Sequence, residues 1–241
     1  MRLRNVRGSR EVVAQNPYVV REPEECRGRW REVFRVGLSA AAAEVPADKC
    51  RAFPGADASA EVLLPSFPLY LEIGVGKGKF LCTMAKRQPQ ACFVGIEKYS
   101  SVLIRALRKA EEEELVNVRF LRMEAEEIQK AFGENEVDKI YLNFSDPWPK
   151  DRHAKRRLPS REFLERFDRI LKEDGRLEFK TDNRTLFEFA LAQLKETGWR
   201  TEAVTRHLHE DPELGKHNIM TEYEERFSAK GSAICKYIAF R

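Results

Sequence analysis

Beyond residue 68, short apolar segments typical of β-strands alternate with longer segments that have the periodicity of amphipathic helices. The strand-type segments are LYLEIG, CFVGIE, VRFLRM, DKIYLNF and RLEFKT, which begin at residues 69, 92, 118, 138 and 176. The helical segments cover residues 79–87, 101–113, 125–132, 163–171 and 184–196. Strands that are joined through helices form a parallel sheet, and right-handed crossovers place the helices on both of its faces. The sequence therefore predicts an α/β fold.

Two more strand-type segments follow the last helical one, RTEAVTRHL from residue 200 and AICKYIAF from residue 233. No clear helical pattern separates them, so one of the two should run antiparallel, at the edge of the sheet. We therefore expect a seven-stranded, mostly parallel sheet with one antiparallel edge strand and helices on both faces.

The first 68 residues differ in composition from the rest of the chain. Residues 1–35 are rich in arginine, whereas residues 37–68 are rich in Ala, Pro, Ser and Gly, as in a loop or an inserted segment. We interpret residues 1–68 as a basic N-terminal region that contains this loop or insertion at 37–68. One large domain should follow at residues 69–241.

Composition narrows the class of protein. Hydrophobic residues make up 42% of the 241, which is typical of a globular chain. No apolar run approaches the ~18–20 residues that span a membrane, and no apolar core follows the charged N-terminus as in a signal peptide. The five cysteines are widely spaced and form no C-x-x-C pair, so neither a disulfide framework nor a zinc site is expected. These features favour a cytoplasmic protein without a metal centre, and they leave open whether it is a monomer or a homodimer.

Positive charge is concentrated in two places. Residues 150–161 hold six cations and one acid, and residues 1–35 hold nine arginines and five glutamates, whereas the remainder carries a net charge of −5. Such clustering is typical of a polyanion partner, although a solvated surface is the simpler explanation of a basic run. Because a distinctive motif precedes the run at 150–161, we favour nucleic acid.

Three glycines follow the first strand and open the next helix. Only glycine at Gly74, Gly76 and Gly78 lets the backbone turn this tightly and approach a ligand closely. In an open α/β sheet, ligands bind outside the carboxyl ends of the strands, where this turn lies. Glu97 ends the second strand, where an acid can accept both hydroxyls of a ribose, and Glu124 follows the third strand, within reach of an adenine edge.

The spacing of the glycines separates two kinds of cofactor. A dinucleotide fold needs G-x-G-x-x-G, whereas the pattern here is G-x-G-x-G, and an acid, Glu72, lies inside the strand. An acid at that position would repel a pyrophosphate and would suit an ammonium or sulfonium group. The loop therefore favours S-adenosyl-L-methionine over NAD.

The fourth strand leads into NFSDPWPKDRHAKRR, in which an acid, two prolines and a tryptophan precede the cations. Asp146 and Trp148 stand at the carboxyl end of that strand, so they are candidates for the reacting centre. Each also has a simpler explanation, since Asp146 before Pro147 can form a turn and Trp148 can belong to the core. Likewise Asp182 and Asn183, after the fifth strand, can cap the next helix.

Five segments together closely resemble the bacterial tRNA (guanine(46)-N7)-methyltransferase family. They are EIGVGKGKFL, GIEKYSSVL, YLNFSDPWPKDRHAKRRL, FKTDN and NIMTEYEERF. The resemblance covers residues 1–35 and the chain from residue 69 onward, and the third and fifth segments are the most specific. It implies a Rossmann-like class I methyltransferase fold, S-adenosyl-L-methionine as the methyl donor, and tRNA as the partner. The reaction would convert the variable-loop guanine at position 46 to 7-methylguanosine.

The resemblance also implies roles for individual residues, with Asp146 as the catalytic one. Together with the glycine loop, it gives a cofactor site of Glu72, Gly74, Gly76, Gly78, Glu97, Glu124 and Asp146. The target nucleoside would contact Lys150, Asp182, Thr221, Glu222, Tyr223 and Glu224. The RNA would contact Arg152, His153, Lys155, Arg156 and Arg157. Family members usually have a shorter Asp or Asn in place of Glu124 and a shorter segment in place of 37–68.

The chemistry of guanine N7 is compatible with these assignments. N7 carries a lone pair and no proton, so no general base is needed, and alignment with the methyl carbon and the sulfur can carry much of the catalysis. Positive charge moves from sulfur to the guanine ring, and a fixed carboxylate such as Asp146 stabilises it. A carboxylate can also accept hydrogen bonds from guanine N1–H and the 2-amino group, and Glu224 is the candidate by resemblance.

Two other classes of protein stay open. One is an RNA-binding protein with an inactive Rossmann-like domain, against which the intact glycines and the acids at the strand ends argue. The other is a methyltransferase that acts on an adenine amine or on a protein. Such amine methylases commonly carry N/D-P-P-Y/F/W after the fourth strand, whereas the motif here is SDPWPK.

Overall fold

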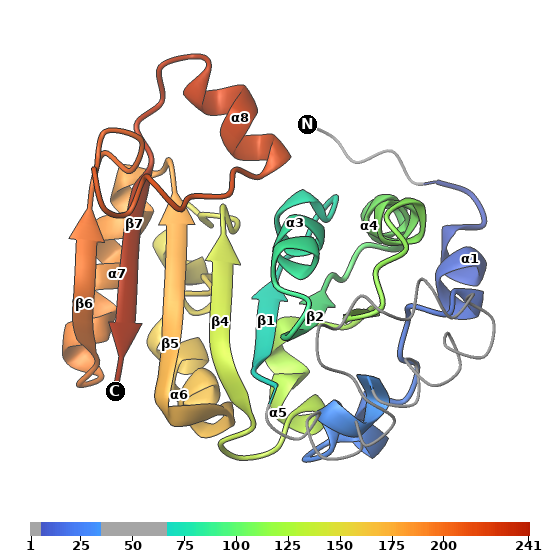
Figure 1. Cartoon of the computed structure of the whole chain (residues 1–241). Helices are drawn as coiled ribbons and strands as arrows, with labels where there is room; N and C mark the ends of the chain where they lie inside the picture. The colour runs from blue at the N-terminus through green and yellow to red at the C-terminus, as the bar shows by residue number, and fades with distance from the viewer. Residues whose placement is uncertain (1–5, 35–66) are drawn as a thin grey trace.

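The computed structural model describes residues 6–34 and 67–241, and the predicted loop or insertion at 37–68 lies almost wholly outside them. The described strands form one seven-stranded sheet in the order β3-β2-β1-β4-β5-β7-β6. Their bounds are Leu69–Ile73 (β1), Cys92–Ile96 (β2), Val118–Leu121 (β3), Val137–Asn143 (β4), Leu171–Thr181 (β5), Arg200–Thr205 (β6) and Cys235–Phe240 (β7). Strands β1 to β5 are parallel and end at one common edge, the upper edge in Figure 1. The predicted α/β fold with a seven-stranded, mostly parallel sheet is confirmed.

The antiparallel strand is β7, which pairs with β5 on one side and with β6 on the other. Both pairings are antiparallel, so the edge strand β6 runs in the same direction as β1 to β5. The sequence predicted the antiparallel strand at the edge itself, whereas β7 lies one position inside it. The reason is that the chain enters β6 two positions away from β5 and then turns back, so that β7 fills the position between them.

Helices cover both faces of the sheet. On one face lie α3 (Lys79–Arg87), α4 (Ser100–Glu112) and the N-terminal α1 (Ser9–Gln15), and on the other lie α5 (Ile128–Ala131), α6 (Arg161–Ile170) and α7 (Arg184–Glu196) (Figure 1). The strand residues alternate between two cores, because Leu71 packs with Phe163 and Phe187, whereas Phe93 packs with Leu103. No helix among the described residues has the length and apolar character needed to cross a membrane.

The start of β5 differs from the sequence prediction. The apolar stripe at 163–171 predicted a helix that the EDG sequence would end, but α6 ends at Ile170 and EDG lies within β5. Val137 pairs with Leu171 while Lys139 pairs with Arg176, so the register shifts between these pairs. The irregularity takes up the extra residues of β5, which is how a glycine and two acids fit at the beginning of a buried strand.

The described part of the N-terminal region packs into the cores of the large domain. Trp30 is fully buried, stacks on Phe132 with ring centroids 5.1 Å apart, and donates from Nε1 to the carbonyl of Ala131 at 2.8 Å. The carboxylate of Glu136 accepts from the backbone N–H groups of Gly28 and Trp30 at 2.9 and 3.0 Å. Residues 28–30 are therefore held by groups that lie more than a hundred positions further along the chain.

Candidate active site

The candidate site lies where β1 and β4 pair side by side. Ile73 is in register with Leu142, so the glycine loop after β1 and the SDPWPK segment after β4 leave the sheet next to each other. The chain after β1 continues into α3 on one face, whereas the chain after β4 continues into α6 on the other. In open α/β sheets, ligands bind where neighbouring connections diverge in this way at the carboxyl ends of the strands, and we call this place the crevice.

The three glycines of the loop have two different functions. Gly74, Gly76 and Gly78 have φ angles of +81°, +59° and +82°. Residues other than glycine rarely adopt this backbone conformation. A Cβ atom on Gly78 would lie 2.6 Å from the Cβ of Ala106, so this glycine lets α3 pack closely on α4. A Cβ atom on Gly74 or Gly76 would meet nothing nearer than 3.9 Å. Open space beside the backbone of these two glycines leaves room for a ligand.

Glu97 connects the end of β2 to the glycine loop. Its carboxylate accepts from the backbone N–H of Gly76 at 3.2 Å and from that of Tyr99 at 3.0 Å. The side chain is buried, and burial raises the pKa of Glu97 although these backbone hydrogen bonds act in the opposite direction. A carboxylate has about four acceptor sites, so Glu97 can still accept a hydrogen bond from a hydroxyl group at the crevice.

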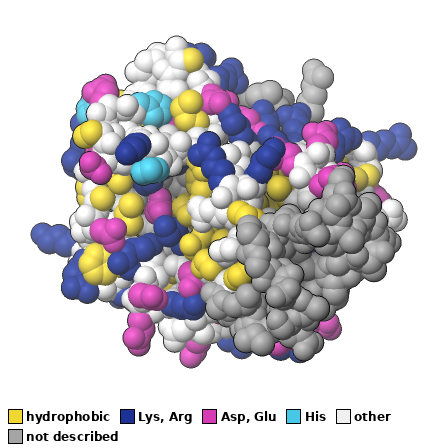
Figure 2. All heavy atoms as spheres, in the orientation of Figure 1, with side chains coloured by type: hydrophobic (Ala, Val, Ile, Leu, Met, Phe, Trp, Pro, Cys, Tyr) yellow, Lys and Arg dark blue, Asp and Glu magenta, His cyan; other side chains and the backbone are white. Residues whose placement is uncertain are grey.

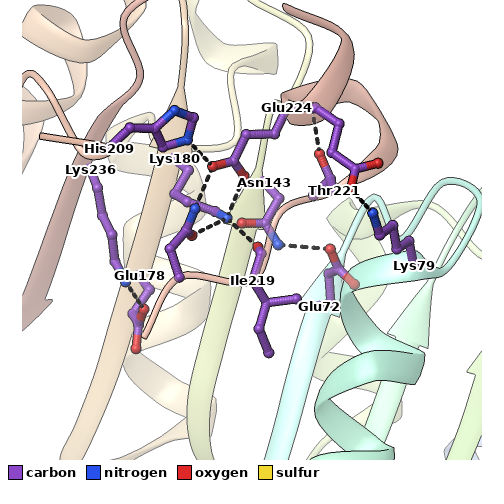
Figure 3. A network of polar contacts seen from close by, with 12 residues as sticks. Glu72, Lys79, Asn143, Glu178, Lys180, His209, Ile219, Thr221, Glu224 and Lys236 are labelled. Atoms are coloured by element: carbon purple, nitrogen blue, oxygen red, sulfur yellow. Dashed lines mark hydrogen bonds and ion pairs between the residues drawn. The ribbon is translucent and has the colours of Figure 1, made fainter. Parts of the chain in front are cut away.

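Glu72 is a buried acid with an incomplete set of partners. One oxygen, Oε1, accepts from Asn143 Nδ2 at 2.8 Å, whereas Oε2 has no hydrogen-bond partner among the described residues (Figure 3). Burial raises the pKa of Glu72 to about 8, against the opposing effects of Asn143 and Lys180. A buried acceptor without a donor is costly, and a ligand cation would satisfy it. Glu72 therefore suits the ammonium group of a methionine-type cofactor.

Glu124 lies at the end of β3 and is exposed. Its carboxylate forms an ion pair with Lys98 at 3.7 Å. Lys98 lies in the connection between β2 and α4. Partial burial alone would lower the pKa of Lys98, but Glu124, Tyr99 and, more weakly, Asp146 outweigh it and raise that pKa. Lys98, which follows β2, is thus paired with the acid that follows β3.

The segment from Phe144 to Trp148 has strained backbone at both ends. Phe144 and Trp148 have φ angles of +53° and +42°, which large L-residues adopt only when the surroundings hold them there. Arg157 provides that support, because its guanidinium donates to the carbonyl of Pro147 at 3.1 Å and to that of Trp148 at 3.1 Å. Arg157 is buried and lies 4.4 Å from the ring centroid of Phe189. The structure thus points to a positioning role for Arg157 in place of the RNA contact predicted for it.

Trp148 belongs partly to the basic segment that follows it. The guanidinium of Arg156 lies 4.9 Å above its ring, and His153 makes an edge-to-face contact at 5.5 Å. The tryptophan is half-buried, whereas Asp146 is exposed. Asp146 is therefore accessible to a substrate, while one face of Trp148 is already covered.

The remaining cations of this segment are Lys150 and those of the short helix that follows it, η6 (Asp151–Arg156). Lys150, Arg152, Lys155 and Arg156 are exposed, and Lys155 pairs with Glu162 at 3.3 Å. Their side chains stand beside the strand end that carries Asp146, so a polyanion bound there would lie next to the crevice.

Glu224 is the largest departure from the predicted site. Thr221 caps the helix α8 (Glu222–Ser228) by accepting from the backbone N–H of Glu224, and the side chain of Glu224 turns inward and is fully buried. Its oxygens accept from Lys180 at 2.8 Å and Asn218 at 2.6 Å, and Oε1 is hydrogen-bonded to His209 at 2.9 Å. Burial would raise the pKa of Glu224, but Lys180 and these hydrogen bonds outweigh it and lower that pKa. The predicted contact of Glu224 with the nucleoside does not suit a side chain enclosed in this way.

Lys180, at the end of β5, is a residue of the site that the sequence did not indicate. Its ammonium group donates to Glu224, to the side chain of Asn218 at 3.0 Å and to the carbonyl of Ile219 at 2.9 Å (Figure 3). All three protons are used, which is what a buried lysine requires. Burial lowers the pKa of Lys180, and Glu224 opposes this effect. The only sequence feature that could have indicated Lys180 is the position of a lysine near the end of an apolar strand, in FKTDN.

The outer side of α8 carries the other predicted nucleoside contacts. Tyr223 is 42% exposed, stacks on Phe227 with centroids 4.1 Å apart, and packs against Phe144 at 5.0 Å. Its hydroxyl donates to Asp182 at 3.2 Å. Asn183, not Asp182, caps α7 by accepting from a backbone N–H at 2.8 Å. Asp182 and Tyr223 are thus brought together from segments forty-one positions apart.

Two ion pairs connect α8 to the opposite wall of the crevice. Glu222 pairs with Lys109 of α4 at 3.0 Å, and Glu225 pairs with Lys79, the first residue of α3. Because α3 begins directly after the glycine loop, α8 lies across the crevice from β5 to α3. This arrangement places Tyr223 over the strand ends.

The raised pKa of Glu72 predicts how stability depends on pH in the ligand-free protein. The pKa is about 8 in the folded protein and 4.5 in the reference state, so between these values the folded state holds a proton that the unfolded chain has lost. Stability from this group should fall as pH rises from about 5 to 8, by up to about 1.4 kcal/mol per pH unit. Urea unfolding of Glu72→Gln and wild type at several pH values should show a difference in free energy that grows with pH. A constant difference would show that Glu72 is ionised throughout.

Comparison with known proteins gives close relatives over the whole chain. The family model described as "Putative methyltransferase" matches residues 66–237. A tRNA (guanine-N(7)-)-methyltransferase of Lachnoclostridium phytofermentans is 49% identical over 241 residues, which cover 100% of this chain and 99% of that protein. A second protein of that name, from Geobacillus thermodenitrificans, is 45% identical over 242 residues, covering 100% of this chain and 98% of its own.

Solved structures with the same fold are more distant in sequence. An antibiotic-related methyltransferase gives a TM-score of 0.54 at 22% identity, covering 73% of this chain and 88% of that one. The 16S rRNA methyltransferase KamB gives a TM-score of 0.54 at 16% identity, covering 77% and 93%. At these identities the likeness concerns the fold alone. The family match spans more than half of the chain and the relatives align along its full length, so the chain belongs to the tRNA (guanine-N7)-methyltransferase family.

Proposed function

We propose that this protein transfers a methyl group from S-adenosyl-L-methionine to N7 of the variable-loop guanine at position 46 of tRNA, forming 7-methylguanosine. The relatives named for N7 methylation of tRNA support the reaction. Within the structure, the observation that carries the proposal is the buried oxygen of Glu72, which lacks a donor beside an open glycine loop. A nucleoside cofactor with an ammonium group and no phosphate fits both features, whereas a pyrophosphate would be repelled by Glu72.

Different residues of the site bind different parts of the cofactor. Glu72 holds the ammonium group, the backbone of Gly74 and Gly76 faces its middle, and Glu97 accepts the ribose hydroxyls. Glu124 lies at the adenine end of the crevice, where its length and exposure allow it to move away from Lys98. Bound there, the cofactor supplies an activated methyl group on a sulfonium.

The target guanine enters from the side of α8. Tyr223 is an exposed aromatic side chain over the strand ends, and a base that leaves the RNA stack gains about 1–3 kcal/mol from stacking on an aromatic ring. Asp182 lies at the hydroxyl of Tyr223 and is only partly buried, so it can accept from guanine N1–H and the 2-amino group. We assign to Asp182 the role that the resemblance gave to Glu224. Thr221, Glu222 and Glu224 then act by holding α8 in place.

Asp146 stabilises the charge that the reaction moves. The N7 lone pair forms the new bond to the methyl carbon while the carbon–sulfur bond breaks toward sulfur, so positive charge passes to the guanine ring without any proton transfer. A carboxylate fixed beside the base favours this charge, and Arg157 holds the segment that carries Asp146. Lys150 and the η6 side chains of Arg152, His153, Lys155 and Arg156 contact the RNA beside it. Action on tRNA supports a location in the cytoplasm.

The reaction is tested by product analysis. The protein should convert an unmodified tRNA transcript, in the presence of methyl-labelled S-adenosyl-L-methionine, to a product with one 7-methylguanosine at position 46. A transcript with adenine at that position is the control and should stay unlabelled. Label in an adenine amine or in protein would support one of the other methyltransferase classes, and cofactor binding without any transfer would support an inactive RNA-binding protein.

Asp146→Asn should separate electrostatic stabilisation from tRNA binding. The substitution keeps the shape of the side chain and removes its charge, so the rate of methyl transfer should fall by about 10²-fold or more. The affinity for tRNA should change little because it depends on the cations. Single-turnover kinetics at saturating tRNA and cofactor measures the rate. A rate near that of the wild type would reduce Asp146 to a turn former before Pro147.

Gly76→Ala should weaken cofactor binding because the added methyl group enters the space beside the loop. Gly198 provides a matched control, since it also has positive φ, +79°, and a Cβ atom there would meet nothing within 4 Å. Both substitutions impose a similar backbone strain of about 1–2 kcal/mol, which denaturant unfolding measures. Calorimetry should show about 10-fold or greater loss of S-adenosyl-L-methionine affinity for Gly76→Ala alone. Equal affinities in the two variants would place the cofactor away from the loop.

A further inference from the structure

The basic N-terminal segment has no part in the site described so far, yet the structure fixes it close to that site. Ser9 and Ser100 share a buried hydrogen bond between their Oγ atoms at 2.9 Å. Ser100 begins α4 three residues after Glu97, at the edge of the sheet that carries the crevice. The start of α1 is therefore held at the same edge, and Arg7 and Arg10 flank Ser9 in the sequence.

Helix α1 is held along its length, so its arginines have defined positions. Val13 of α1 is buried in the same apolar core as the buried residues of α4. At the far end, Asn16 donates to Glu111 at 2.6 Å, and the hydroxyl of Tyr18 donates to the carbonyl of Ala110 at 3.2 Å. Contacts at both ends of α4 prevent α1 from swinging away from the domain.

The arginines near this junction are not neutralised by neighbouring acids. Arg7 and Arg10 are exposed, and within the described residues neither makes an ion pair or a side-chain hydrogen bond. The same holds for Arg105 and Arg108 on the exposed side of α4. Glu11 is the one acid in α1. Figure 2 shows Lys and Arg side chains over the region of α3, α4 and α1, with Asp and Glu side chains among them. Unpaired arginines that stay hydrated are the kind that release counterions when they meet phosphates.

We propose that Arg7 and Arg10 form a second RNA-binding surface, on the side of the crevice opposite to η6. Helix η6 packs beside α6 on one face of the sheet, whereas α1 packs beside α4 on the other. A tRNA that presents a guanine to Asp146, between these two faces, can contact both groups of cations at once. The proposal rests on tRNA being the substrate. A protein that binds a nucleic acid is expected to have clustered cations where the phosphate backbone passes on each side of the site.

The test is the salt dependence of tRNA binding by the double variant Arg7→Ala/Arg10→Ala, measured at equilibrium between 50 and 200 mM salt. Each phosphate contact contributes about 0.7–0.9 to the slope of log affinity against log salt concentration. Loss of two contacts should therefore flatten the slope by about 1.4–1.8 and weaken binding at every salt concentration. Affinity for S-adenosyl-L-methionine should stay unchanged, which also shows that the variant is folded.

A matched control removes the same charge at the opposite edge of the sheet. Arg87 ends α3 ahead of β2, and Arg169 lies in the last turn of α6 ahead of β5, and both are exposed. Arg87→Ala/Arg169→Ala should keep the wild-type slope. An unchanged slope for Arg7→Ala/Arg10→Ala, or an equal fall in both variants, would overturn the proposal. At saturating tRNA, Arg7→Ala/Arg10→Ala should still form 7-methylguanosine, so failure of the wild type to form it concerns the reaction and not this surface.

Discussion

The architecture of the site depends on a buried ion pair between Lys180 and Glu224. Two charges removed from water are stable only when hydrogen bonds satisfy them, and here the ammonium group has three acceptors and the carboxylate has three partners. One partner belongs to a central strand and the other to a short helix that the sheet does not otherwise hold. The pair thus fixes α8 at the strand ends, and with it the positions of Tyr223 and Thr221.

Glu72 and Glu178 show why the crevice calls for a cationic ligand. Both are acids on central strands, but Glu178 has Lys236 at 2.7 Å and Lys139 at 3.0 Å. Burial would raise the pKa of Glu178, and the two lysines outweigh it and lower that pKa. Glu72 has only an amide as a close partner, and its pKa is raised. Glu72 is the more deeply buried of the two, and it lacks the positive charge beside it that the cofactor would supply.

The sequence was sufficient for the features that depend on neighbours along the chain. Strand-helix alternation gave the sheet, and glycine spacing together with Glu97 and Asp146 at strand ends located the crevice. The roles of Glu224 and Arg157 could not be predicted in this way. The partner of Glu224, Lys180, lies forty-four positions away in the sequence. Arg157 donates to backbone carbonyls, which no sequence pattern indicates. A charged residue looks alike in sequence whether it faces RNA or a buried partner. Only the structure distinguishes an RNA-facing residue from one with a buried partner. In the same way, only the structure shows that Asn183 and not Asp182 caps α7.

The position of β7 affects the order in which the protein can be assembled during synthesis. Residues 235–240 fill the space between β5 and β6, so β6 has no place in the sheet until this last strand has left the ribosome. Until then, the edge of β5 offers unpaired backbone groups to any other extended chain. The glycine loop is made early, but the segment that carries α8 is held between β6 and β7 and closes over it only when both strands are in place. A nascent chain that stops short of residue 235 should therefore need protection by chaperones while it already contains most of the residues of the crevice.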